Sequence, residues 1–224
     1  MLYLDFDGVL FDSSRETLKN FNYSFNAFCL SNNVIVDDNK SINVYIKENR
    51  GSIGPIEDFF LILEELPQID NIIEFSLIKE NLPFLVSKFL EYRMIQKELS
   101  YEDWCLLHEP SPLAIICKRE GFKFKIVSTK DEDSLADICK FFDLSPQQIY
   151  GKESFEKFGS KTDIIVADMH KGQIFEAAFF DDNVNHLFRN DRIKNYFVEW
   201  GYGNNTDYSI INENNLNEVL RQWI

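Results

Sequence analysis

Cysteine and histidine are scarce in this chain of 224 residues. Structural zinc sites use closely spaced cysteine and histidine ligands. Only three histidines are present, and the four cysteines form no CxxC pair, so such a site is not expected. Widely separated cysteines are typical of reduced, mostly buried thiols in a cytosolic protein. They are Cys29, Cys105, Cys117 and Cys139.

Long apolar runs are also missing, and glycine and proline are sparse. No stretch of about 18 apolar residues, the length that a membrane-spanning helix needs, occurs in the sequence. The first residues show no basic region followed by an apolar run, the pattern of a targeting segment. We therefore expect a cytoplasmic protein without a membrane span. The 9 glycines and 6 prolines indicate packed elements with few flexible linkers.

Positive charge is under-represented, with 23 lysines and arginines against 37 aspartates and glutamates, a net charge of −14. Such a field repels nucleic acid and anionic membranes, so neither is an expected partner. It also repels a phosphorylated substrate, which would need a divalent cation and a few well-placed lysines. The length suffices for one elaborated domain or two.

The most informative residues that are present stand at the N-terminus. A short apolar strand, expected over Leu2–Phe6, carries Asp5 and is followed by Asp7 and Gly8. Side chains two positions apart on a strand point to the same face, so the two carboxylates can converge on one ligand. Their mutual repulsion requires a cation nearby. The pattern indicates a metal-assisted site at the end of this strand.

The remainder of the chain divides into a helical block and an alternating region. The next comparable strand, Phe122–Val127, comes more than a hundred residues later and follows a helix stop at Gly121. From there, strands and helices alternate, which predicts an α/β fold with a parallel sheet and helices on both faces. Helices are expected over 131–142, 162–169 and 216–224, and strands over 148–150, 177–180 and 195–199.

The block between the first two strands is expected to be a helical insertion. We assign residues 1–12 and 101–224 to the α/β core and residues 13–100 to the insertion. Ser13 or Ser14 can cap the first helix, which carries apolar residues at helical spacing to about Leu30. Further helices are expected over 37–47, 57–66 and 71–99, with Pro83 near a boundary or kink.

In parallel sheets, ligands bind beyond the carboxyl ends of the strands. Those ends carry three groups of polar residues. They are Asp5 with Asp7, then Ser128-Thr129-Lys130, and then Asp181-Asp182. Lys161 adds a cation at the start of a helix, and Lys152 competes with it for this role. Carboxylates, a hydroxyl and an ammonium group are the inventory of phosphoryl transfer with magnesium.

In this order the motifs resemble those of the haloacid-dehalogenase-like (HAD) hydrolase superfamily, and its phosphoglycolate-phosphatase-like branch in particular. The resemblance implies a Rossmann-like α/β core with an inserted helical cap domain. The matching segments span nearly the whole chain. They are the stretch 5–13, the stretch 126–130, Lys161 before a helix, the stretch 179–183, Arg50 to Pro55, and Glu199 to Gly203.

The resemblance also implies a role for each site residue. Asp5 would attack phosphorus, and Asp7 would protonate the leaving oxygen and later deprotonate water. Ser128 and Lys161 would bind the transferring phosphate, which makes them catalytic as well as substrate-binding. Thr129 and Arg50 are further substrate-binding candidates. Mg²⁺, the expected cofactor, would be held by Asp5, the backbone carbonyl of Asp7, and Asp182.

Several of these residues have an ordinary structural alternative. Asp181 is either a metal ligand or part of a helix cap, and Arg50 is either an anion binder or a solvated loop residue. His186 reads as an ordinary residue. Trp200 to Gly203 reads as packing and turn structure.

Two departures from the family pattern leave the substrate open. Thr162 follows the motif lysine where proline is usual. The pair Asp181-Asp182 replaces Gly-Asp, and His186 stands where a second carboxylate is usual four residues on. The phosphoryl chemistry is unaffected, but the sequence does not favour phosphoglycolate over other phosphomonoesters.

The sequence thus predicts a Mg²⁺-dependent phosphatase acting on a small phosphorylated metabolite. Asp7 argues against a dehalogenase, because carbon–halogen cleavage needs no acid for an alkoxide leaving group. A sugar phosphomutase would use the same two aspartates, and a non-catalytic binding protein on this fold is a third alternative. The oligomeric state is not predicted.

Overall fold

The computed structural model describes residues 1–35, 40–66, 73–204 and 207–223. The chain forms two compact units. One contains Met1–Asp12 and Glu109–Ile224, and the other contains Ser13–His108. The second unit extends beyond residue 100, the boundary expected from the sequence. The reason is local, since Lys97 of the preceding helix lies over the Trp104 ring at 4.8 Å.

The first unit is built on a six-stranded sheet in the order β5-β4-β1-β6-β7-β8. Each neighbouring pair is parallel, which confirms the predicted α/β class. The strands are β1 (Leu2–Leu4), β4 (Phe124–Val127), β5 (Gln148–Tyr150), β6 (Ala177–Asp181), β7 (Ile193–Val198) and β8 (Ser209–Ile211). All residues of β1 and β6 are buried, as expected for central strands covered on both faces.

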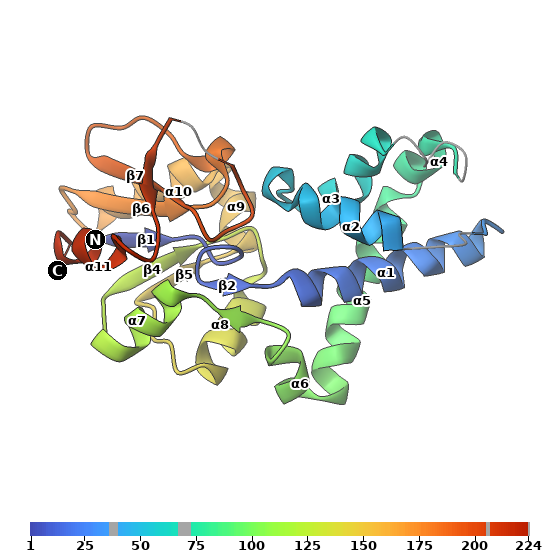
Figure 1. Cartoon of the computed structure of the whole chain (residues 1–224), viewed down its shortest axis with the longest axis horizontal. Coiled ribbons are helices and arrows are strands. Elements are labelled where there is room, and N and C mark those ends of the chain that lie inside the picture. Colours follow the sequence, from blue (N-terminus) through green and yellow to red (C-terminus); the bar gives the residue numbers. More distant parts are fainter. Residues whose placement is uncertain (36–39, 67–72, 205–206, 224) are drawn as a thin grey trace. The chain divides into compact units, whose positions relative to one another are not determined.

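Helices cover both faces of this sheet (Figure 1). The pair α9 and α10 lies on one side, and the pair α7 and α8 on the other. The helices of this unit are α7 (Pro112–Glu120), α8 (Glu132–Phe141), α9 (Lys152–Phe158), α10 (Lys161–Lys171), α11 (Leu216–Arg221) and the 3₁₀ turn η4 (Val184–His186). Strand β8 and helix α9 are not predicted by the sequence pattern, because both are short and mostly exposed.

The topology brings the predicted site residues to one edge of the sheet. From the central β1, the chain adds β4 and β5 on one side and β6, β7 and β8 on the other. The order therefore reverses at β1, and the crevice beyond the carboxyl ends of the strands at such a point is the usual ligand site of this architecture. Asp5 follows β1, Ser128 follows β4, and Asp181 ends β6.

A separate two-stranded ribbon stands where the chain leaves the first unit and returns to it. Strands β2 (Phe11–Asp12) and β3 (Glu109–Pro110) are antiparallel, with Asp12 opposite Glu109. A turn at Gly8, which has φ +82°, precedes the ribbon. This left-handed conformation favours glycine.

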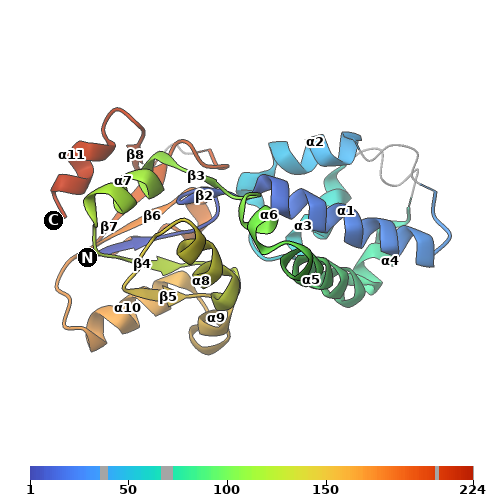
Figure 2. The ribbon, with the colours of Figure 1, turned by 90° about the horizontal axis from the view of Figure 1, so that it is seen from below.

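The second unit is helical, as predicted for the insertion. It contains α1 (Ser14–Ser31), α2 (Lys40–Glu48), η1 (Arg50–Ser52), α3 (Asp58–Leu61), η2 (Ile62–Glu65), α4 (Phe75–Glu80), α5 (Leu82–Leu99) and α6 (Tyr101–Cys105). Figure 2 shows α1 and α5 side by side. A buried pair joins them, with Arg93 Nε 2.7 Å from Glu16 Oε1.

The core of the helical unit confirms the spacing predicted for the first helix, since Phe21, Phe25 and Phe28 are fully buried. The structure confirms a boundary near Pro83 in the helical stretch predicted over 71–99. Two helices meet at Asn81, and Pro83 lies in the first turn of α5, where its missing N–H has no intrahelical partner in any case. Residues 37–39 and 71–72 of the predicted helices, and Ile224, lie outside the described residues.

In the part of the chain that the structure describes, none of the helices combines the length and apolar character needed to cross a membrane. The four cysteines are free and buried, as predicted. Burial raises the pKa of the Cys29 thiol to about 11 and the pKa of Cys117 and Cys139 to about 12. These thiols are therefore protonated at neutral pH and unreactive.

Candidate active site

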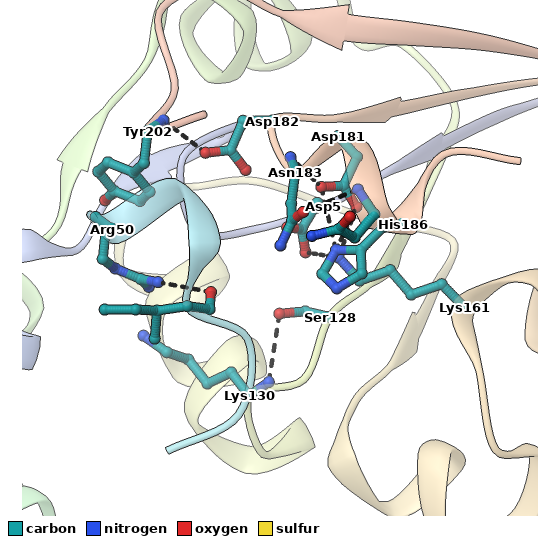
Figure 3. Close-up of polar contacts among 12 residues, drawn as sticks. Asp5, Arg50, Ser128, Lys130, Lys161, Asp181, Asp182, Asn183, His186 and Tyr202 are labelled. Atoms are coloured by element: carbon teal, nitrogen blue, oxygen red, sulfur yellow. Dashed lines mark hydrogen bonds and ion pairs between the residues drawn. The ribbon is translucent and has the colours of Figure 1, made fainter. Parts of the chain in front are cut away.

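The site is centred on Asp5, the residue that follows β1. Its carboxylate is buried, and Oδ1 lies 2.9 Å from Nζ of Lys161. The same ammonium group lies 2.7 Å from Oδ2 of Asp181 at the end of β6. One buried cation thus bridges two carboxylates that come from neighbouring strands (Figure 3).

Lys161 is presented by the first turn of α10. Ser160 caps this helix, because its hydroxyl oxygen accepts a hydrogen bond from the N–H of Asp163 at 3.1 Å. The lysine side chain is only 3% exposed. Lys152, the alternative considered from the sequence, is exposed at the start of α9. Geometry therefore favours Lys161 as the lysine of the site.

The charges of this cluster shift one another's ionisation. Burial raises the pKa of Asp5 to about 6, although Lys161 opposes the shift. Burial by itself would lower the pKa of Lys161, but the carboxylates of Asp181 and Asp5 outweigh it and the pKa is raised. The pKa of Asp181 is lowered, since Lys161 and His186 overcome the effect of its burial. Of these two carboxylates, Asp5 is thus the one whose ionised form the protein stabilises less.

His186 belongs to this cluster, although the sequence gives it an ordinary reading. Its Nδ1 lies 3.2 Å from Oδ2 of Asp181. Asp5, Asp181 and His186 offer ligand atoms within 4.8 Å of one another and form a group able to hold a metal ion. The signal was present in the sequence, because His186 occupies the position at which the family pattern has a second carboxylate.

Asp182 lies apart from this group of three. Its Oδ2 accepts a hydrogen bond from the backbone N–H of Tyr202 at 2.6 Å (Figure 3). The structure therefore groups Asp5 with Asp181 and not with Asp182, the metal ligand that the sequence comparison favours. Which of the two adjacent carboxylates binds a cation stays a prediction.

Asp7 lies beyond β1 next to Lys130, a residue of the second polar group to which the sequence assigns no separate role. Its Oδ1 is 3.2 Å from Nζ of Lys130, and this ammonium group also lies over the Phe6 ring at 5.4 Å. Lys130 directly follows the predicted residues Ser128 and Thr129, so its position at a strand end was the signal for it. The contact fixes the direction of the Asp7 carboxylate.

Ser128 and Thr129 occupy the turn after β4. Ser128 is buried, and its hydroxyl oxygen accepts a hydrogen bond from the N–H of Lys130 at 3.3 Å. Thr129 is partly exposed. Both stand at the carboxyl edge of the sheet, as the sequence predicts.

Arg50, the remaining predicted site residue, belongs to the helical unit. There its guanidinium group lies over the Phe59 ring at 4.9 Å, and Nη1 donates a hydrogen bond to the carbonyl of Ile53 at 3.3 Å. These contacts hold the loop around η1 together. A role in substrate binding stays a prediction.

Comparison with solved structures identifies the fold. A predicted phosphatase from Clostridium acetobutylicum matches with a TM-score of 0.66 and 20% identity, over 99% of this chain and 97% of that one. A haloacid dehalogenase-like family hydrolase from Streptococcus pneumoniae matches with a TM-score of 0.64 and 20% identity, over 100% and 97%. A predicted phosphoglycolate phosphatase from Haemophilus somnus matches with a TM-score of 0.65 and 12% identity, over 98% and 97%.

These matches cover both chains almost completely. At such low identity the similarity establishes the fold. No protein-family model and no curated protein sequence matches the chain.

Proposed function

We propose that this chain, which has the fold of the haloacid-dehalogenase-like hydrolases, is a Mg²⁺-dependent phosphatase that hydrolyses a small phosphomonoester. The observation that carries the proposal is the buried contact of 2.9 Å between Asp5 at the end of β1 and Lys161 at the start of α10. In this contact a buried carboxylate, the nucleophile that we propose, lies beside a cation that could neutralise a phosphate oxygen.

In the first step, a carboxylate oxygen of Asp5 attacks phosphorus and the bond between phosphorus and the ester oxygen breaks. The leaving oxygen takes a proton from Asp7, and an aspartyl-phosphate remains on Asp5. In the second step, water attacks this phosphorus and gives its proton to Asp7. Inorganic phosphate leaves, and Asp5 is restored.

Other residues of the site bind and position the phosphate. Lys161 sits beside the attacking carboxylate, and the Ser128 hydroxyl at the end of β4 donates to a phosphate oxygen. Lys130 holds the Asp7 carboxylate at 3.2 Å. These groups come from separate strand and helix ends, and the packed sheet keeps them in fixed positions.

The donor set fits a hard divalent cation, because it contains several carboxylates in a buried setting and Asp5 is not neutralised by Lys161 alone. When bound, Mg²⁺ would supply positive charge that offsets the charge of the phosphate. We propose Asp5, the Asp7 carbonyl and Asp182 as the residues that hold it, with Asp181 and His186 nearby.

The substrate we propose is a small phosphorylated metabolite of the cytoplasm. The helical unit Ser13–His108 would act as a cap that shapes specificity and limits access of water, with Arg50 as a candidate contact to the substrate. The net charge of −14 supports the absence of nucleic acid and anionic membranes from its partners.

A panel of phosphomonoesters tests the proposal, assayed for inorganic phosphate with Mg²⁺ and again with excess EDTA. We expect Asp5→Asn to lower kcat by at least about 10³-fold, because the nucleophile is removed. Asp191→Asn, which changes an exposed carboxylate of the same unit, serves as the control and should retain wild-type turnover.

Circular dichroism would show that both variants are folded. Wild-type turnover by Asp5→Asn would exclude Asp5 as the nucleophile. Conversion of a hexose phosphate to an isomer without release of phosphate would instead identify a phosphomutase.

A further inference from the structure

The segment Glu199–Gly203, which follows β7, is not explained by the chemistry above. In the structure it wraps around Asp182, the residue after β6. Parallel pairing of β6 with β7 brings the two strand ends together, with Asp181 opposite Phe197. The segment is therefore placed to act on the site through Asp182.

Three glycines leave room for Asp182. A Cβ atom on Gly8 would lie 2.3 Å from Oδ2 of Asp182, and one on Gly201 would lie 2.2 Å from its Cβ. A Cβ atom on Gly203 would lie 1.9 Å from its carbonyl oxygen. No side chain can be accommodated at such distances. The position of Asp182 is thus fixed sterically from two directions, the turn after β1 and the segment after β7.

Tyr202 makes two hydrogen bonds in different directions. Its backbone N–H donates to Oδ2 of Asp182 at 2.6 Å, and its hydroxyl donates to Oδ1 of Asp12 at 2.7 Å. Trp200 reinforces the second direction, since its indole N–H donates to the carbonyl of Val9 at 3.2 Å. One short segment therefore holds both the Asp182 carboxylate and the stretch 9–12.

Asp12 is the last residue of the first unit before the chain enters the helical unit. It lies opposite Glu109, with which the chain returns, in the ribbon of β2 and β3. The hydroxyl of Tyr202 thus binds the ribbon through which both chain connections pass. A shift of the ribbon would therefore move Tyr202 and, through the backbone N–H of Tyr202, the Asp182 carboxylate.

We propose that Tyr202 is a positioning residue that couples the orientation of the Asp182 carboxylate to the β2–β3 ribbon. The coupling to metal binding rests on the proposed function, in which Asp182 helps to hold Mg²⁺. Tyr202 touches neither substrate nor metal in this scheme. It keeps the Asp182 carboxylate and the β2–β3 ribbon in one arrangement.

Tyr202→Phe tests the proposal, because it removes only the hydroxyl and leaves the backbone bond to Asp182. We expect its Mg²⁺ affinity, measured by titration calorimetry without substrate, to fall about three- to tenfold, the range expected for one ordinary hydrogen bond. Hydrogen exchange over residues 8–12 should become faster. Asp12→Ala should give the same two changes, and the double variant should add little to either single one.

Tyr208→Phe is the matched control. It removes another tyrosine hydroxyl of the same unit, one that donates to the carbonyl of Leu187 at 3.2 Å. We expect it to change neither Mg²⁺ affinity nor exchange over residues 8–12.

Three outcomes would count against the proposal in different ways. Unchanged exchange and Mg²⁺ affinity in Tyr202→Phe would overturn it. Faster exchange with unchanged affinity would reduce the hydroxyl to a structural contact and overturn the coupling. A wild-type protein that binds no Mg²⁺ would contradict the proposed function together with the metal arm of the coupling, and the exchange measurement would still decide whether Tyr202 holds the ribbon.

Discussion

At the scale of single residues, the site depends on how one buried ammonium group is shared. Lys161 contacts both Asp5 and Asp181, but the pKa of Asp181 is lowered while that of Asp5 is raised. The difference arises because His186 hydrogen-bonds to Asp181, whereas the neighbouring charge of Asp181 adds to burial in raising the pKa of Asp5. The protein thus keeps Asp181 ionised and leaves Asp5 as the carboxylate that gains most from an added cation.

This difference predicts the acid side of the pH profile. Burial raises the pKa of Asp5 to about 6, and only the ionised carboxylate is a nucleophile. We therefore expect kcat/KM to fall as the pH drops through about 6, with protonation of Asp5. A bound divalent cation favours the ionised form and should move this limb to lower pH, so the limb should shift as the Mg²⁺ concentration is raised. An acid limb that does not shift with the Mg²⁺ concentration would have to be assigned to a group other than Asp5.

At the scale of elements, the position of Lys161 depends on how α10 is fixed to the sheet. Asp168, two turns further along this helix, accepts hydrogen bonds from the hydroxyls of Tyr3 and Tyr150, both at 2.6 Å. Nζ of Lys125 lies 2.5 Å from the same carboxylate. The three donors come from β1, β5 and β4. A single carboxylate thus ties the helix to three strands.

Removing this carboxylate should loosen α10. We expect Asp168→Asn to lower the free energy of unfolding by about 1–3 kcal/mol, since a charge-assisted network is weakened. Asp191→Asn, an exposed change in the turn before β7, should cost no more than about 0.5 kcal/mol. Urea titration at neutral pH measures both.

The effect should depend on pH. The pKa of Asp168 is lowered, because hydrogen bonds from Lys125, Tyr150 and Tyr3 outweigh its burial. Its contribution is therefore present above the ordinary value of 3.8 and is lost as the pH falls below it. Equal stability of wild type and Asp168→Asn at neutral pH would contradict this account.

At the scale of the whole molecule, the net charge of −14 opposes the binding of an anionic substrate. The lysines of the site act locally, whereas the surrounding acidic groups act at long range and are screened by salt. Salt that screens the acidic groups weakens their repulsion of the substrate, whereas salt that screens the lysines weakens their attraction for it. The two effects therefore change substrate binding in opposite directions as the ionic strength rises.

If the long-range field dominates association, salt should favour substrate binding. We expect KM for a phosphomonoester, at saturating Mg²⁺, to fall about two- to fivefold between roughly 10 and 150 mM NaCl. A KM that rises with salt would show instead that the local field of the lysines controls association. The same measurement with tetramethylammonium chloride in place of NaCl controls for specific effects of sodium.

The sequence by itself determined the fold class and the edge of the sheet on which the site lies. Apolar runs that end in Asp5, Ser128 and Asp181 specify strands and strand ends, since local hydrophobic pattern decides which short segments are buried in a parallel sheet. The helical insertion follows from the spacing of residues such as Phe21 and Phe25. The short, exposed strand β8 and helix α9 were missed, because neither carries a strong local pattern.

Only the tertiary structure decided which side chains meet. Lys130 pairs with Asp7, His186 with Asp181, and Tyr202 with both Asp182 and Asp12. Asp12 and Tyr202 stand 190 residues apart in the chain. Such contacts depend on strand order and register, which place distant residues side by side, and no local pattern encodes them.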